Sequence, residues 1–195
     1  MTTLTIDSLA HGGAGVGRAD GLVYFVPFTA PGDKVKVNII SQKKNYAEAE
    51  LVEILEASPH RVKPPCSVFG QCGGCQWQHV SYEEQLKQKS LIVSHALARI
   101  AKEEGIEIKP IIPSPDVFNY RNRAQFRSLG PKIGFYARKT HTLIEPDQCH
   151  IIEPALNAEL QDIRKSLKTA PPERTSKFEE FIGKDGKAIR TFNKK

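Results

Sequence analysis

The chain contains four cysteines, and three of them lie within ten residues in the spacing C-x5-C-x2-C. In sequence order the four are Cys66, Cys72, Cys75 and the distant Cys149. Four thiolates in this pattern can close around one metal centre, whereas a disulfide framework would not place three sulfurs so close together. Gly73 and Gly74 let the backbone turn its N–H groups toward the sulfurs, which favours an iron–sulfur cluster.

Spacing alone leaves other uses of these cysteines open. A structural zinc site also favours four thiolates, and His79 can stand in for one sulfur. Zinc ribbons usually present two C-x2-C pairs, however, and here Cys149 is single. Four unrelated free cysteines are a further alternative. An electron-transfer protein is disfavoured, because ferredoxin-like chains usually keep their ligands in one tight run and are acidic rather than basic.

Composition places the chain among globular proteins that stay in the cytoplasm. Its 195 residues, 39% of them hydrophobic, suffice for one large domain or two to three small ones. No apolar run approaches the roughly 18–20 residues of a membrane span, and the N-terminus lacks the features of a signal peptide. In a reducing cytoplasm, cysteines bind metal or catalyse more often than they cross-link.

Positive charge is concentrated in one region. The net charge is +6, and residues 117–144 contain no Asp or Glu. Six basic residues fall in this stretch, namely Arg121, Arg123, Arg127, Lys132, Arg138 and Lys139. Such a concentrated field suits a polyanion, with RNA or DNA as the default partner. The alternative is a solvated sheet face whose counter-charges come from elsewhere in the fold.

Residues 1–57 are predicted to form a small all-β domain. Short apolar runs alternate with turns such as Asp20-Gly21, and four or five such strands favour a closed barrel of the OB type. A basic cluster on this domain comprises Lys34, Lys36, Lys43 and Lys44. The glycine-rich stretch 12–17 does not fit a dinucleotide fingerprint, since Arg18 occupies a glycine position and no helix follows. It predicts a turn or bulge in the barrel.

Residues 58–168 are predicted to form the cysteine loop and a central α+β domain. Ser81 and Glu84 form a capping box that begins a helix, Leu86, Val93, Leu97 and Ile100 mark its apolar stripe, and Gly105 can end it. Strands are expected over 107–112, 119–128, 132–136 and 141–145, followed by a helix over 153–168. In the second of these strands, alternation places four side chains on one face, namely Arg121, Arg123, Gln125 and Arg127.

Residues 169–195 are predicted to form a Lys-rich, weakly patterned basic tail, which we interpret as the start of a truncated segment. Pro171 and Pro172 end the preceding helix. One hairpin is possible around Lys184 and Gly186.

The cysteine segment resembles the signature of a known family. Residues 66–89, which include Cys-Gly-Gly-Cys-Gln-Trp-Gln-His, together with Cys149, are similar to the cluster motif of the RNA uracil-C5 methyltransferases. The resemblance continues into Tyr-Arg-Asn-Arg-Ala-Gln-Phe at 120–126 and Gly-Phe-Tyr at 134–136. It is greatest to the branch that modifies 23S rRNA. Residues 1–57 resemble the TRAM domain, an OB-like RNA-binding barrel.

The resemblance implies a cofactor and a set of site residues. The 4Fe–4S ligands would be Cys66, Cys72, Cys75 and Cys149. The barrel and the central β region would contact RNA through Lys34, Lys36, Lys43, Lys44, Arg121, Arg123, Gln125, Arg127, Lys132 and Arg138. In the family, chemistry also needs S-adenosylmethionine, bound through a Gly-rich loop, and a cysteine that adds to C6 of uracil. No such loop follows Gly134, and no cysteine follows Cys149.

The expected fold class is therefore α+β, with an OB-like (TRAM) barrel, an iron–sulfur loop, a helix and an antiparallel β central domain, and with the Rossmann-like methyltransferase domain absent. We expect an RNA-binding, 4Fe–4S-containing portion of a 23S rRNA (uracil-5-)-methyltransferase that has no catalytic residue and transfers no methyl group alone. S-adenosylmethionine would enter only with the full-length family or a partner chain. A zinc-stabilised RNA-binding adaptor without enzymatic activity is the alternative.

Overall fold

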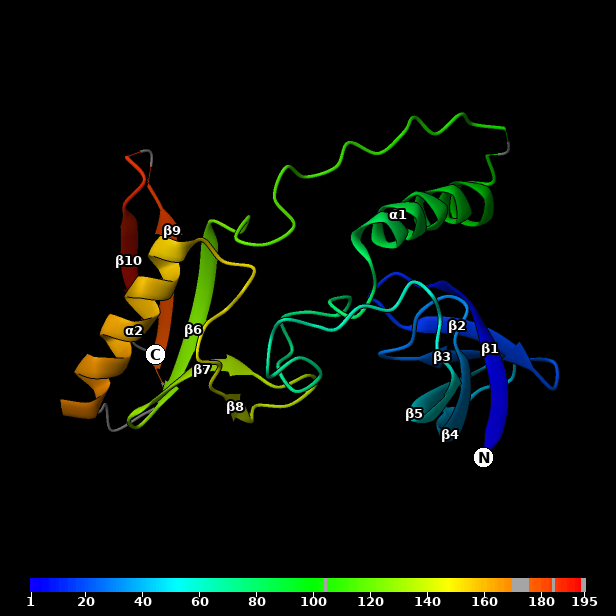
Figure 1. Cartoon of the computed structure of the whole chain (residues 1–195), viewed down its shortest axis with the longest axis horizontal. Helices are drawn as coiled ribbons and strands as arrows, with labels where there is room; N and C mark the ends of the chain where they lie inside the picture. Colours follow the sequence, from blue (N-terminus) through cyan, green and yellow to red (C-terminus); the bar gives the residue numbers. More distant parts are fainter. Residues whose placement is uncertain (104, 170–175, 184, 194–195) are drawn as a thin grey trace. The chain divides into compact units, whose positions relative to one another are not determined.

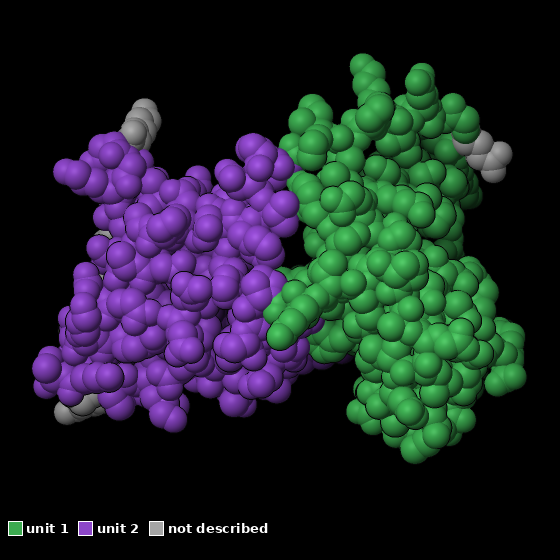
Figure 2. Space-filling model, viewed as in Figure 1, with its two compact units in different colours: residues 1–64, 76–113 green, residues 65–75, 114–195 purple. Residues whose placement is uncertain are grey.

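The chain divides into two compact units, and each unit is assembled from two stretches of sequence (Figures 1 and 2). The computed structural model describes residues 1–103, 105–169, 176–183 and 185–193. One unit contains Met1–Pro64 and Gln76–Pro113, and the other contains Pro65–Cys75 and Ser114–Lys195. The first three cysteines therefore share a unit with Cys149, which lies more than 70 residues further along the chain.

Five strands of the first unit form a closed barrel, as expected for this region. Their bounds are β1 (Thr2–Leu9), β2 (Gly15–Ala19), β3 (Leu22–Val26), β4 (Lys34–Gln42) and β5 (Tyr46–Glu56). The order around the barrel is β1-β2-β3-β5-β4, and only the β3–β5 pair is parallel. Alternate side chains fill the interior, as period-two burial requires, and these are Leu4, Ile6, Tyr24, Val26, Val35, Val37, Ala47 and Ala49.

The glycine-rich stretch supplies a strand rather than only a turn or bulge. Gly15 and Gly17 lie in β2, where a Cβ on Gly17 would collide with the Leu4 side chain and the Thr5 carbonyl. Strand β1 therefore approaches β2 more closely than a side chain would permit. The bulge lies in β1, after Ile6. The turn at Asp20 and Gly21, both at positive φ, joins β2 to β3 as predicted.

Helix α1 (Tyr82–Ala96) completes the first unit and begins where the sequence predicts. The Ser81 hydroxyl accepts a hydrogen bond from the Glu84 N–H at 3.4 Å. A π-helical turn, η1 (Leu97–Ala101), extends the helix to Lys102, whose φ of 57° ends it before the predicted Gly105. The strand expected over 107–112 does not form. Pro110 and Pro113 each remove a ladder donor from this stretch, which disfavours pairing.

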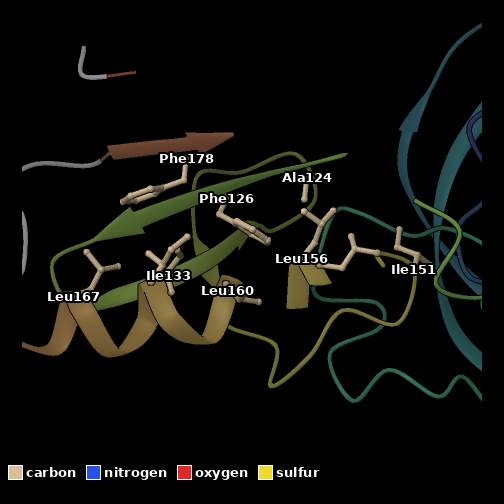
Figure 3. Packing of buried hydrophobic residues seen from close by; sticks show 10 residues of the cluster. Ala124, Phe126, Ile133, Ile151, Leu156, Leu160, Leu167 and Phe178 are labelled. Carbon is tan, nitrogen blue, oxygen red and sulfur yellow. The ribbon is translucent and has the colours of Figure 1, made fainter. Parts of the chain in front are cut away.

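The second unit contains an antiparallel sheet covered by one helix. The strands are β6 (Arg123–Leu129), β7 (Lys132–Tyr136), β8 (Leu143–Ile144), β9 (Ser176–Ile182) and β10 (Ala188–Asn193), in the order β10-β9-β6-β7-β8. Helix α2 (Pro154–Thr169) packs its apolar stripe on one face (Figure 3). The core between them contains Ala124, Phe126, Ile133, Ile151, Ile152, Leu156, Leu160, Ile163, Leu167 and Phe178.

Sequence patterns located β7 and α2 but misjudged the ends of this sheet. Strand β6 begins at Arg123, because the preceding Arg121 instead exchanges backbone hydrogen bonds with Ile151 and Glu153. The region expected to be a basic tail contributes β9, which pairs with β6, and β10. Prolines 171 and 172 and Lys184, singled out above, lie outside the described residues.

Neither helix in the described part of the chain combines the length and apolar character that crossing a membrane requires.

Candidate cysteine centre and nucleic-acid interface

The first three cysteines lie on a loop built from tight turns. The Phe69 N–H donates to the Cys66 carbonyl at 3.2 Å, and the Cys72 N–H donates to the Val68 carbonyl at 3.0 Å. Gly70, at φ 89°, supplies the left-handed residue between them. None of the four cysteines forms a disulfide, and all are half-buried. The loop thus presents thiols from a compact backbone scaffold.

The cysteine loop is bonded to the sheet of its own unit. The Gly73 N–H donates to the Tyr136 carbonyl at 3.0 Å, and Cys72 forms an isolated β-bridge with Ala137. A Cβ on Gly73 would lie 3.0 Å from that carbonyl, so only glycine fits there without a shift. The loop is therefore an extension of the end of β7.

Cys149 is held between β8 and α2 by a side-chain clamp. The Asn157 amide accepts a hydrogen bond from the Cys149 N–H at 2.8 Å and donates to the Cys149 carbonyl at 3.0 Å. Burial raises the pKa of the Cys149 thiol, while backbone N–H groups of Ile151 and Ile152 and the charge of Arg121 act in the opposite direction. Burial and the charge of Cys66 outweigh these groups, so the pKa of Cys149 is raised overall.

The sulfurs interact electrostatically across the two segments. Burial raises the pKa of Cys72, the Gly74 N–H lowers it by donating to the sulfur at 3.4 Å, and the charges of Cys149 and Cys66 raise it further. Sulfurs that raise one another's pKa, and that accept backbone N–H groups, match the chemistry of ligands to a cationic centre. Within the described residues, no three His, Cys, Asp or Glu side chains are grouped to hold a metal ion. The ligand set stays a prediction.

His79, the alternative zinc ligand, belongs to the barrel unit. Its Nε2 lies 3.1 Å from the Thr29 carbonyl, and its ring contacts Phe28 edge to face. Burial lowers the pKa of His79, so the ring stays neutral in this environment.

The arginines predicted to share one face have three different environments. Arg123 and Gln125 both donate to the Glu179 carboxylate on β9, Gln125 at 3.0 Å. These hydrogen bonds lower the pKa of Glu179. Arg121 lies close enough to Cys149 to influence its titration. Residues 117–144, which contain no Asp or Glu, therefore receive a counter-charge from Glu179 on β9. For Arg123, this agrees with the alternative of a solvated sheet face whose counter-charges come from elsewhere in the fold.

Arg127 contacts an aromatic ring. Its guanidinium lies 5.5 Å from the centre of the Tyr136 ring, and no ion pair to it is present among the described residues. The Tyr136 and His141 rings meet edge to face with centres 5.1 Å apart. Lys132 is exposed at the start of β7, and Arg138 is half-buried just beyond its end. A cation and two aromatic rings, adjacent to the cysteine loop, suit contact with phosphates and bases.

On the barrel, the predicted basic cluster divides into two pairs. Lys34 forms an ion pair with Glu56 at 2.7 Å, and Lys36 lies opposite Glu53 in the β4–β5 ladder. Lys43 and Lys44 are exposed in the turn between β4 and β5, and no ion pair to either is found in the described part of the chain. Attraction to a polyanion is therefore strongest at the turn.

Known proteins match both units. The model of the TRAM domain matches residues 2–52. An RNA methyltransferase of uncharacterized function from Bdellovibrio bacteriovorus is 40% identical over 183 residues, which cover 94% of this chain and 47% of that protein. Another, from Synechocystis, is 39% identical over 86% of this chain and 37% of its own length. The chain thus spans about half or less of the length of these relatives.

A solved structure matches the fold. The Pyrococcus abyssi tRNA (uracil-54, C5)-methyltransferase in complex with S-adenosyl-L-homocysteine superposes with a TM-score of 0.71 and 25% identity, over 97% of this chain and 45% of that one. RNA methyltransferases are thus the class that the sequence and fold matches define. These matches confirm the resemblance of this chain to the RNA uracil-C5 methyltransferases.

The same match corrects the expected fold class. That class treated the methyltransferase domain as absent, yet nearly the whole chain aligns with a stretch of a complete methyltransferase. The lack of a Gly-rich S-adenosylmethionine loop, and of a cysteine that could add to uracil, holds only for these 195 residues. The prediction that a domain is absent from the fold is wrong, because it drew a conclusion from the end of a sequence.

Proposed function

We propose that residues 1–195 form the RNA-binding, 4Fe–4S-carrying part of an S-adenosylmethionine-dependent 23S rRNA (uracil-5-)-methyltransferase. The observation that carries this proposal is the attachment of the cysteine loop to β7, through Gly73 and Tyr136, beside Arg127. A metal centre there would stabilise the loop next to a surface that suits RNA. The TRAM match adds a second RNA-binding element in the barrel.

The cluster would be held by Cys66, Cys72, Cys75 and Cys149. The donor set supports this, since thiolates and bridging sulfides accept the kind of N–H groups found at Cys72 and Cys149. When bound, the cluster would supply a cross-link between the loop and the segment before α2. It would have no role in methyl transfer, and no described residue is assigned a catalytic role.

Methyl transfer would need the further residues that the relatives contain outside the stretch matched by this chain. The solved relative was determined with S-adenosyl-L-homocysteine, which supports S-adenosylmethionine as the donor for the whole protein. That additional length could belong to the same polypeptide or to a separate chain. Residues 1–195 alone should transfer no methyl group from labelled S-adenosylmethionine to uracil-containing rRNA, and turnover in that assay would contradict the proposal.

Metal and sulfide analysis tests the cluster directly. Protein purified without oxygen should be coloured and contain roughly four iron and four sulfide per chain. Serine at any one of the four cysteine positions should lower both contents. Zinc at about one per chain without sulfide would instead support the adaptor, because a tetrathiolate zinc site is colourless.

RNA titrations test the partner. Affinity for 23S rRNA fragments should fall steeply as salt rises, because phosphate contacts release counterions. A transfer RNA of equal length is the matched competitor, since the solved relative acts on tRNA. Equal affinity for the two RNAs would contradict the assignment to 23S rRNA while leaving RNA binding intact.

A further inference from the structure

An aromatic pair lies on the outer surface of the barrel, where β3 meets β5. Tyr24 and Val26 are buried in the interior, so the alternation of β3 turns Phe25 outward. In the same way, the buried Ala47 of β5 turns Tyr46 outward, and Tyr46 is 39% exposed. The rings of Phe25 and Tyr46 meet edge to face, with centres 5.8 Å apart and planes at 81°. Neither ring belongs to the apolar core of the barrel.

Backbone hydrogen bonds fix the pair to the turn between β4 and β5. Val23 of β3 lies opposite Tyr46 in the parallel ladder, and its N–H donates to the Asn45 carbonyl at 3.3 Å. The Lys43 N–H donates to the Tyr46 carbonyl at 2.8 Å. The rings and the lysines of the turn are therefore held together before any ligand arrives, as in most binding sites.

Positive charge lies on one side of the rings. Lys43 and Lys44 are exposed just before Tyr46, and no ion pair to either is found in the chain as far as it is described. Glu48 is two residues beyond Tyr46 and so lies on the same face of β5. A polyanion that crosses the rings is therefore drawn to the side of the turn.

Other cations on the outer surface of the barrel are already neutralised. Lys34 forms an ion pair with Glu56 at 2.7 Å, and Arg18 on β2 forms one with Asp7 at 3.0 Å. Outward aromatic rings and lysines without an ion pair thus coincide, among the described residues of the barrel, at the end of the β3–β5 pair.

We propose that Phe25 and Tyr46 form a stacking site for unpaired bases of RNA, with Lys43 and Lys44 contacting the adjacent phosphates. OB-type barrels bind oligonucleotides on the face of their second and third strands and at the loop between the fourth and fifth. Phe25 lies on the third strand, and the lysines occupy that loop. The inference rests on the proposed function, and it adds the rings that contact the RNA.

This site should select for the unpaired state of the RNA rather than for its sequence. Every base has a flat face that can stack on an exposed ring, so stacking tolerates any sequence. Bases inside a duplex are already stacked on their neighbours and do not present these faces. Single strands should therefore bind, and duplexes should compete poorly.

A fluorescent base tests the stacking. RNAs of about ten unpaired nucleotides, within the size that one OB fold covers, carry 2-aminopurine at each position in turn and are titrated with the whole chain. Emission should be quenched at one or more positions, because stacking on an aromatic ring quenches it. Tyr46→Leu should abolish that quenching and weaken affinity about tenfold, whereas Tyr46→Phe keeps the ring and should retain both. Val52→Ala is the control, since Val52 is 44% exposed further along the same strand.

Salt dependence separates the rings from the lysines. Replacing both Lys43 and Lys44 by Gln should reduce the slope of log K against log salt by roughly 1.4, since each phosphate contact to a single strand contributes roughly 0.7. Tyr46→Leu should leave the slope unchanged, because stacking releases no counterion. Lys34→Gln is the matched control, since Glu56 already neutralises Lys34.

Three outcomes would overturn the stacking site. They are quenching that Tyr46→Leu leaves unchanged at every position, a slope that Lys34→Gln reduces as much as the lysine pair does, and equal competition by a duplex of the same sequence. Tight RNA binding with any of these results would contradict this inference alone. Absence of RNA binding by the unsubstituted chain would contradict the proposed function as well.

Discussion

Arg61 contacts both carboxylate oxygens of Asp33, a residue with no exposed surface, through hydrogen bonds of 2.8–3.0 Å. The same guanidinium donates to the Phe28 carbonyl at 2.8 Å. Asp33 also accepts the N–H groups of Ala30 at 2.6 Å and Ser58 at 2.9 Å. The pair therefore fastens the segment after β5 to the turn before β4.

Removing the cation should destabilise the barrel strongly. Arg61→Ala leaves a buried carboxylate without its partner, and we expect a loss of about 3–5 kcal/mol in the free energy of unfolding. Arg18→Ala is the control, because its ion pair with Asp7 is exposed and should contribute less than about 1 kcal/mol. Urea denaturation measures both, and equal losses would show that the buried pair has no special role.

Acid should weaken the same barrel through Asp33. Burial would raise the pKa of Asp33, but hydrogen bonds from Arg61, Ala30 and Ser58 and the Arg61 charge hold it below its ordinary value. A carboxyl whose folded pKa is depressed stabilises the fold above its unfolded pKa, roughly 3.9, and this stabilisation is lost as pH falls through the folded pKa. Urea midpoints from pH 6 to pH 3 should fall less steeply in Asp33→Asn than in the unsubstituted protein.

The two arginines of β6 should differ in RNA binding. Glu179 already neutralises Arg123, whereas Arg127 lies on the Tyr136 ring. Arg127→Ala should weaken RNA affinity and reduce the slope of log K against log salt by about 1, and Arg123→Ala should have a smaller effect. Glu179→Gln should strengthen binding by releasing Arg123. Equal losses from the two alanine substitutions would count against this division.

Asn157 should determine how firmly Cys149 holds its metal. Asn157→Ala removes both hydrogen bonds to the Cys149 backbone, so iron should be lost to a chelator faster than from the unsubstituted protein. Gln161→Ala is the matched control on α2, since its amide bonds the exposed Asp147 carbonyl. Visible absorbance during chelation follows the loss, and identical rates for the two variants would exclude a positioning role for Asn157.

Gly73 should be more sensitive to substitution than its neighbour. A methyl group on Gly73 would lie 3.0 Å from the Tyr136 carbonyl, whereas one on Gly74 would meet only the Cys72 sulfur at 3.5 Å. Gly73→Ala should therefore displace the loop from β7 and lower the iron content, and Gly74→Ala should retain it. Iron per chain in the two variants, purified in parallel without oxygen, measures the difference.

Local periodicity sufficed wherever a segment's own pattern decides its structure. The barrel, β7 and α2 follow from alternation and from the spacing of Leu156, Leu160, Ile163 and Leu167. Local patterns did not predict the environment of a side chain whose partner is distant in the sequence. Glu179 neutralises Arg123 from 56 residues away, and no local signal predicts that pairing.

Helix α1 shows the same limit for burial. The sequence marks Leu86 and Val93 as part of the apolar stripe of this helix, yet its buried residues are Glu84 and Gln88. Gln88 is buried where its side chain accepts a hydrogen bond from the Leu9 N–H at the end of β1. Among candidate site residues, Asn157 was missed because its role depends on a backbone segment eight residues earlier. The spacing of Cys66, Cys72 and Cys75 is a local pattern that the sequence does display, and their role as ligands stays a prediction.

Closure of the barrel has a consequence for how this unit tolerates change. Strand β1 pairs with both β2 and β4, so the circuit β1-β2-β3-β5-β4 has no free edge. A slip by one residue in any ladder would have to be matched in the other four. Insertions should therefore be accepted only at the connecting turns, and the five strands should melt as a single cooperative unit.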